Sequence, residues 1–195
     1  MTHHPSPAIP PATVDRLRLA RLQYAQAVSP FYDEVLLEVI ERGREASCLG
    51  KADIGALTLW KRLRADTPWA SRRIETPESR VREVTRRAHH DANDAGLDVV
   101  RAATQARNQL RELPGFTYGD ALASAVLLAL APDRLAVYDR RASLALTRLD
   151  LPLREQQGRY GHYMRTVESL RLAACTPQEP WTARDVDVAL YWIGR

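Results

Sequence analysis

The chain has 195 residues, of which 45% are hydrophobic and 27% are charged, a composition that is ordinary for one globular domain. Its longest apolar run, 121–131, is shorter than the roughly 18 residues that a membrane-spanning helix needs, so we expect no membrane protein. The formal net charge of +4 is compatible with a nucleic-acid partner but does not indicate one.

The basic side chains are almost all arginines, and the exceptions are Lys51 and Lys61. An arginine excess suits phosphate recognition, because the guanidinium group is a planar fork of donors. A codon bias in the source genome would produce the same excess, so composition does not choose between the two explanations. Two cysteines cannot build a disulfide framework, and we expect Cys48 and Cys175 to be small buried side chains.

Residues 1–11 are polar and proline-rich, and we expect a disordered tail there, followed by a single helical domain over 12–195. The tail lacks the apolar segment and small-residue cleavage site of a secretory signal, so we expect a cytoplasmic protein. Apolar spacing, N-cap residues and helix breakers predict helices over 12–28, from 30 onwards, and over 52–64, 78–96, 98–113, 119–131, 139–149, 159–174 and 183–193. Alternating strand patterns are absent, which predicts an all-α fold of about eight to ten helices.

The most informative segment is 113–146, LPGFTYGDALASAVLLALAPDRLAVYDRRASLAL. It begins with a glycine-containing turn, continues as a helix rich in small residues, and ends with a short apolar stretch that leads to Asp139 at a helix start. This order resembles the signature of the helix-hairpin-helix DNA glycosylase superfamily. In that family a Leu-Pro-Gly-Val-Gly type hairpin precedes a small-residue helix, and an apolar stretch then delivers a catalytic aspartate. Weaker likeness extends to 54–64 and 187–194.

The resemblance implies a helix-hairpin-helix glycosylase-like fold and a monofunctional base-excision N-glycosylase that acts on double-stranded DNA without a cofactor or a metal ion. It implies that Asp139 is the catalytic carboxylate, which a helix N-terminus would keep ionised. In such proteins the main-chain N–H groups of the hairpin hold a DNA phosphate, and a base is flipped into a pocket. The DNA-binding residues implied here are Gly115, Phe116, Thr117, Tyr118, Gly119, Arg140 and Arg141.

The sequence departs from the family pattern at two places. Ala121 stands where bifunctional members carry a lysine that forms a Schiff base with the sugar, and no lysine follows Lys61, so lyase chemistry is not expected. The second hairpin glycine, Gly119, is separated from Phe116 by Thr117 and Tyr118, which makes the hairpin longer than in the family.

Several of these residues also have simpler explanations. Asp139 would cap its helix even without a function. Arg140 and Arg141 would either contact phosphate or shield the carboxylate. Lys61 could face the DNA, but a solvated helix face is the simpler assignment for it. A non-catalytic DNA-binding module or a protein-interaction domain that keeps the fold is therefore the alternative function.

The remaining conspicuous side chains give weaker signals. Trp60 and Trp192 lie at apolar helical spacing, so we expect them to pack in the core. The sequence His89-His90-Asp91 resembles part of a helical metal site but lacks further ligands, and we expect an exposed helix end there and no metal.

Overall fold

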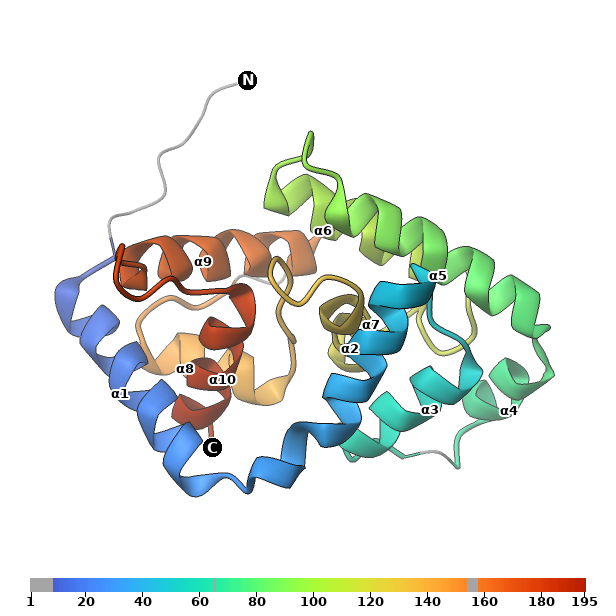
Figure 1. The fold of residues 1–195 in the computed structure, drawn as a ribbon, viewed down its shortest axis with the longest axis horizontal. Helices are drawn as coiled ribbons and strands as arrows, with labels where there is room; N and C mark the ends of the chain where they lie inside the picture. The colour runs from blue at the N-terminus through green and yellow to red at the C-terminus, as the bar shows by residue number, and fades with distance from the viewer. Residues whose placement is uncertain (1–8, 65, 154–157) are drawn as a thin grey trace.

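The computed structural model describes residues 9–64, 66–153 and 158–195, and it confirms the all-helical expectation for this part of the chain. These residues form ten α-helices and one short 3-10 helix, and no strands. In chain order they are α1 (Pro11–Ala27), η1 (Pro30–Asp33), α2 (Glu34–Ala46), α3 (Lys51–Trp60), α4 (Pro68–Glu75), α5 (Glu78–Asn93), α6 (Val99–Leu110), α7 (Ala121–Leu130), α8 (Arg140–Arg148), α9 (Arg159–Ala174) and α10 (Ala183–Ile193) (Figure 1).

The observed bounds agree with the sequence pattern most closely in the C-terminal part of the chain. Helices α9 and α10 coincide with their predicted ranges, and the Thr182 side chain caps α10. Pro11, assigned to the tail, is the first residue of α1, and residues 1–8 of the predicted tail lie outside the described ranges. Helix α4 was not predicted, because eight residues are too few to establish a helical repeat.

Helix α7 lies at the centre of the molecule (Figure 1). Its residues 122–130 are all buried, as its continuous run of Ala, Leu and Val predicts for a helix surrounded by others. Helices α2, α3, α5 and α6 pack against it, whereas α10 packs against α1, α8 and α9. The chain therefore passes from the first group of helices to the second immediately after α7.

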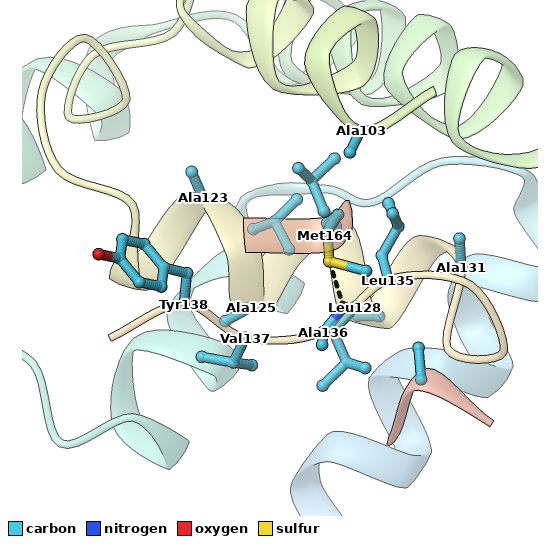
Figure 2. Packing of buried hydrophobic residues seen from close by; sticks show 14 of the residues in the cluster. Ala103, Ala123, Ala125, Leu128, Ala131, Leu135, Ala136, Val137, Tyr138 and Met164 are labelled. Carbon is cyan, nitrogen blue, oxygen red and sulfur yellow. Dashed lines mark hydrogen bonds between the residues drawn. The ribbon is translucent and has the colours of Figure 1, made fainter. Parts of the chain in front are cut away.

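That passage is the non-helical segment 135–138, which is buried and runs beside α7 (Figure 2). Buried backbone N–H and C=O groups need partners, and a segment outside a helix or sheet must find them elsewhere. For residues 136–138 these partners are side chains of three helices: Ser124 of α7, Tyr160, Tyr163 and Met164 of α9, and Asp187 of α10. The segment is thus held in place by polar groups as well as by packing.

The composition also gave expectations about cysteines and membrane helices. Cys48 is buried and Cys175 is partly buried, and neither forms a disulfide. Among the helices in the described ranges, none combines the length and the apolar character needed to cross a lipid bilayer.

Replacing Tyr163 with phenylalanine tests how much one of these polar contacts stabilises the fold. The Tyr163 hydroxyl donates to the Val137 carbonyl oxygen at 2.8 Å, and its loss leaves that buried oxygen without its partner. We expect the free energy of unfolding in urea to fall by about 1–3 kcal/mol. Tyr118→Phe is the matched control, because Tyr118 is 89% exposed, and it should leave stability unchanged. Equal stability of the two variants would contradict this account of the segment.

Candidate active site

Asp139 follows the buried segment directly and begins α8. Its Oδ1 atom accepts hydrogen bonds from the main-chain N–H groups of Arg141 at 2.9 Å and Ala142 at 3.0 Å. The predicted N-cap is therefore confirmed. Because Oδ1 is bound to the helix N-terminus, the orientation of the carboxylate is set and its other oxygen, Oδ2, points elsewhere.

Oδ2 contacts the ammonium group of Lys61, which lies just beyond the last residue of α3. The side chains of Lys61 and Asp139 are only 11% and 19% exposed. Sequence reasoning favoured a solvated helix face for Lys61, and that assignment is wrong. The lysine is instead half of an ion pair between α3 and α8.

The position of Lys61 follows from the way α3 ends. The N–H of Arg62 donates to the carbonyl of Leu59 at 2.8 Å, and the N–H of Leu63 donates to that of Thr58 at 3.0 Å. This is the Schellman arrangement, in which the residue after the cap adopts a left-handed conformation, and Arg62 has a φ of +53°. Lys61 also packs over the Trp60 ring, with Nζ 5.5 Å from the ring centroid.

The surroundings of Asp139 act on its charge in opposite directions. Burial disfavours the ionised form, but the Lys61 ammonium and the two main-chain N–H donors outweigh this effect. The pKa of Asp139 is therefore lowered from its ordinary value, and the carboxylate is ionised at neutral pH.

A cavity of about 380 Å³ opens beside the ion pair. Pockets that bind small molecules fall in the range of roughly 300–1,000 Å³. Among the described residues of its wall, Asp139 is the only acidic one, whereas four are basic, namely Lys61, Arg62, Arg140 and Arg141. The other lining residues are Tyr32, Leu63, Ala121 and Tyr191. The cavity therefore suits a ligand that carries negative charge and presents a flat, partly apolar surface.

Behind the ion pair lies a second charged group centred on Arg184 of α10. Its guanidinium donates to Asp33 at 2.7 Å and contacts Asp187, and Asp33 also accepts from the Trp60 indole N–H at 3.1 Å. Burial raises the pKa of Asp187 above its ordinary value even though Arg184 opposes this change. These contacts hold the Trp60 side chain against α10. Because Lys61 follows Trp60 in the chain, they also help to set the position of Lys61.

The two arginines that follow Asp139 are placed differently from each other. Arg140 is exposed, and Arg141 is partly buried with its guanidinium 4.4 Å from the centroid of the Tyr191 ring. In the described residues neither arginine forms an ion pair with an acidic side chain. Both therefore remain able to bind an anion at the cavity.

The predicted hairpin residues do not all face the same region. The Phe116 side chain is completely buried, so only its main chain could meet a partner, while Tyr118 is 89% exposed. Thr117 and Gly119 line a different cavity of about 310 Å³. The structure thus groups Asp139 with Arg140 and Arg141, and places the hairpin residues outside that cavity wall.

Arg107 of α6 holds the hairpin from inside. Its guanidinium donates to the carbonyl oxygens of Phe116 at 2.8 Å and Gly119 at 2.9 Å, and to the Asp120 carboxylate at 2.9 Å. Within the described ranges, the main-chain N–H groups of Thr117, Tyr118 and Gly119 donate no hydrogen bond. The carbonyl oxygens of Phe116 and Gly119 therefore point towards Arg107, while the N–H groups of residues 117–119 can donate hydrogen bonds to a partner.

Gly115 is required at its position for two reasons. Its φ of +88° is one that glycine adopts readily, and a Cβ atom there would lie 2.5 Å from the Trp69 ring of α4. Trp69 therefore covers the start of the hairpin, a contact that the sequence did not reveal because α4 was not predicted.

The His89-His90-Asp91 sequence has a structural role. Asp91 accepts a hydrogen bond from the Gln109 amide at 2.9 Å, which links α5 to α6. In the described part of the chain, no three His, Cys, Asp or Glu residues gather as a metal site would require.

Replacing Lys61 with methionine should raise the pKa of Asp139, because burial would no longer be opposed by the ammonium group. A ¹³C NMR titration of the aspartate carboxyl carbons measures this directly. Since the folded-state pKa of Asp139 is depressed, its ionisation stabilises the wild-type fold above the unfolded-state pKa of about 3.9, and this stabilisation is lost as the pH falls through the folded-state pKa. Lys51→Met is the control and should leave the Asp139 titration unchanged. An unchanged titration in Lys61→Met would show that the contact is not maintained in solution.

Protein-family models, curated protein sequences and solved structures were compared with the chain, and none of them matches it. The chemistry of the site therefore has to be inferred from its own residues. These are an ionised carboxylate, an amine in contact with it, and a cavity whose other charged groups, in the part of the chain that the structure describes, are basic.

Proposed function

We propose that this protein is a DNA base-excision N-glycosylase-like enzyme with the helix-hairpin-helix glycosylase architecture, and that Asp139 is its catalytic carboxylate. One observation carries the proposal: Asp139 is held ionised on the wall of a cavity in which every other charged side chain of the described ranges is basic. A single carboxylate in basic surroundings suits a substrate that is anionic overall but develops positive charge at the reacting atom.

The side chains of the cavity wall are suited to bind the phosphate, the sugar and the base of a nucleotide. Lys61, Arg62, Arg140 and Arg141 would neutralise phosphates, which supply most of the affinity of proteins for DNA. Tyr32 and Tyr191 offer aromatic surfaces against which a base or a sugar can pack. A base inside a duplex cannot reach such a cavity, so the target nucleotide would be flipped out of the helix.

The orientation of Asp139 suits cleavage of the N-glycosidic bond. When this bond breaks, the base leaves with the electron pair and positive charge develops on the sugar. Oδ1 is held by the N-terminus of α8, so Oδ2 is the oxygen that can stabilise the sugar cation or accept a proton from an attacking water molecule. The carboxylate is preorganised, because its two main-chain donors do not have to move during the reaction.

The hairpin would position the DNA. Its available N–H groups at Thr117, Tyr118 and Gly119 can bind a phosphate, as main-chain amide nests do. Such contacts set the register of the duplex without reading its sequence. Arg107 stabilises this conformation by holding the carbonyl oxygens on the opposite side of the loop.

A non-catalytic DNA-binding module is the second candidate function. The observation that favours it is the Lys61–Asp139 ion pair, because the ammonium group contacts the oxygen that the reaction would use. In that case the basic cavity wall would bind phosphate and Asp139 would serve only as a helix cap.

Replacing Asp139 with asparagine tests the catalytic proposal. The asparagine keeps the N-cap but not the charge, so the fold should be retained while base release falls by about 10²–10³-fold. The assay uses duplexes with oxidised, alkylated or deaminated bases and detects abasic sites by alkaline cleavage. Asp98→Asn is the matched control, because Asp98 caps α6 through the same kind of hydrogen bond and does not line the cavity. Equal base release by the two variants, or no release by the wild type on any lesion, would remove the enzymatic proposal.

Replacing Arg140 with alanine tests the DNA contact separately from the chemistry. Loss of one phosphate contact should weaken duplex binding and reduce the slope of log affinity against log salt concentration by about one. Arg165→Ala is the control, since Arg165 is also exposed but lines another cavity. Salt-dependent binding without any base release would favour the non-catalytic alternative, and binding that does not respond to salt would contradict both candidates.

A further inference from the structure

The cavity beside Asp139 carries a surplus of positive charge. Among the described residues of its wall, four positive side chains against one negative leave a net charge of +3. Lys61 and Asp139 neutralise each other as an ion pair. Arg62, Arg140 and Arg141 form no ion pair with an acidic side chain within the described ranges. Three guanidinium charges on the wall are therefore left uncompensated.

The neighbouring acidic and phenolic groups do not offset this surplus. Asp33 and Asp187 lie behind the ion pair, where Arg184 contacts both of them, and neither lines the cavity. Burial raises the pKa of Tyr32 to about 12, so its hydroxyl on the cavity wall carries no charge at neutral pH. A ligand in the cavity thus meets a positive electrostatic potential.

The two tyrosine rings of the wall are each already in contact with a guanidinium group. The Arg141 guanidinium lies 4.4 Å from the centroid of the Tyr191 ring, and that of Arg62 lies 5.6 Å from the centroid of the Tyr32 ring. An aromatic ring attracts a cation through its negative face. A second cation brought to either ring would be repelled by the arginine already there, whereas an uncharged base could stack without this penalty.

We propose that the base excised in this cavity is uncharged, as deaminated and oxidised bases are, and that the cavity rejects a base that N-alkylation has made cationic. The inference rests on the proposed function, because it names the class of base on which that function would act. Arg62 and Arg141 are then specificity-determining residues, since each supplies positive charge and also contacts an aromatic ring of the wall.

The direction of charge transfer in the reaction favours the same class of base. When the bond between C1′ and an uncharged base breaks, the base keeps the electron pair and becomes an anion, which the arginines would stabilise. Water then adds its oxygen to C1′ and passes a proton to Asp139, and the base anion takes a proton from the solvent. A cationic base instead leaves as a neutral molecule, so the arginines would oppose its binding without stabilising its departure.

Single-turnover base release by the full-length protein tests this inference. The duplexes are identical except for one nucleotide, which carries uracil, hypoxanthine or 8-oxoguanine as the uncharged base, or 7-methylguanine as the cationic base. Protein-dependent release is measured by alkaline cleavage of abasic sites after subtraction of the protein-free rate. We expect release of at least one uncharged base and no protein-dependent release of 7-methylguanine.

Replacing Arg141 tests whether its charge sets the selectivity. We expect Arg141→Gln to slow release of the uncharged base by about 10²-fold, because one stabilising charge is lost, and not to slow release of 7-methylguanine. Arg141→Lys keeps the charge and should restore most of the wild-type selectivity. Arg165→Gln is the matched control, because Arg165 is exposed and lines another cavity. A purely structural role for Arg141 would change release of both classes of base in the same proportion.

Release of 7-methylguanine as fast as, or faster than, every uncharged base would overturn the inference and leave the proposed function standing. An unchanged ratio of the two rates in Arg141→Gln would likewise overturn the role of this arginine in selectivity. Failure of the wild type to release any of the four bases, or undiminished release by Asp139→Asn, would instead overturn the proposed function and this inference with it. Circular dichroism and thermal unfolding of each variant establish that it is folded.

Discussion

The polypeptide between α7 and α8 has to cross the protein interior without forming a helix. Its buried N–H and C=O groups would each cost about 1–3 kcal/mol if they were left unpaired. The side chains that pair with them come from α7, α9 and α10 (Ser124, Tyr160, Tyr163, Met164 and Asp187). One non-helical segment therefore ties three helices together, and Figure 2 shows the methionine contact among the apolar side chains around it.

The candidate site is a direct consequence of this segment. Asp139 is the first residue after it, so the position of the carboxylate is set by the contacts that hold 135–138. Behind the ion pair, the Arg184 network holds Trp60 and so sets the position of the end of α3 next to α8. The carboxylate and the amine thus come from two chain segments whose relative position depends on α10, which contributes Asp187 to one and Arg184 to the other.

The sequence predicted features that depend on neighbouring residues. The sequence could predict the helix caps at Asp139 and Thr182 and the burial of α7. A cap or a continuous apolar run can be recognised from a few consecutive residues, because the interactions involved are local. The Lys61–Asp139 contact could not be predicted, since it joins residues 78 positions apart and nothing near Lys61 indicates its partner. Arg107 was missed for the same reason: a buried arginine that binds two carbonyl oxygens has the same sequence pattern as a solvated one.

Stability alone is a weak explanation for the Lys61–Asp139 pair. Removing two charges from water costs several kcal/mol per ion, and replacing a buried pair by well-packed apolar residues is often neutral or stabilising. Asp139 would cap α8 without Lys61, because the cap uses Oδ1 and the lysine contacts Oδ2. The ammonium is therefore not needed for the helix, and it lies on the wall of a cavity instead of in the closed core. An ion pair with that location and that cost is more readily explained by chemistry at the cavity than by folding.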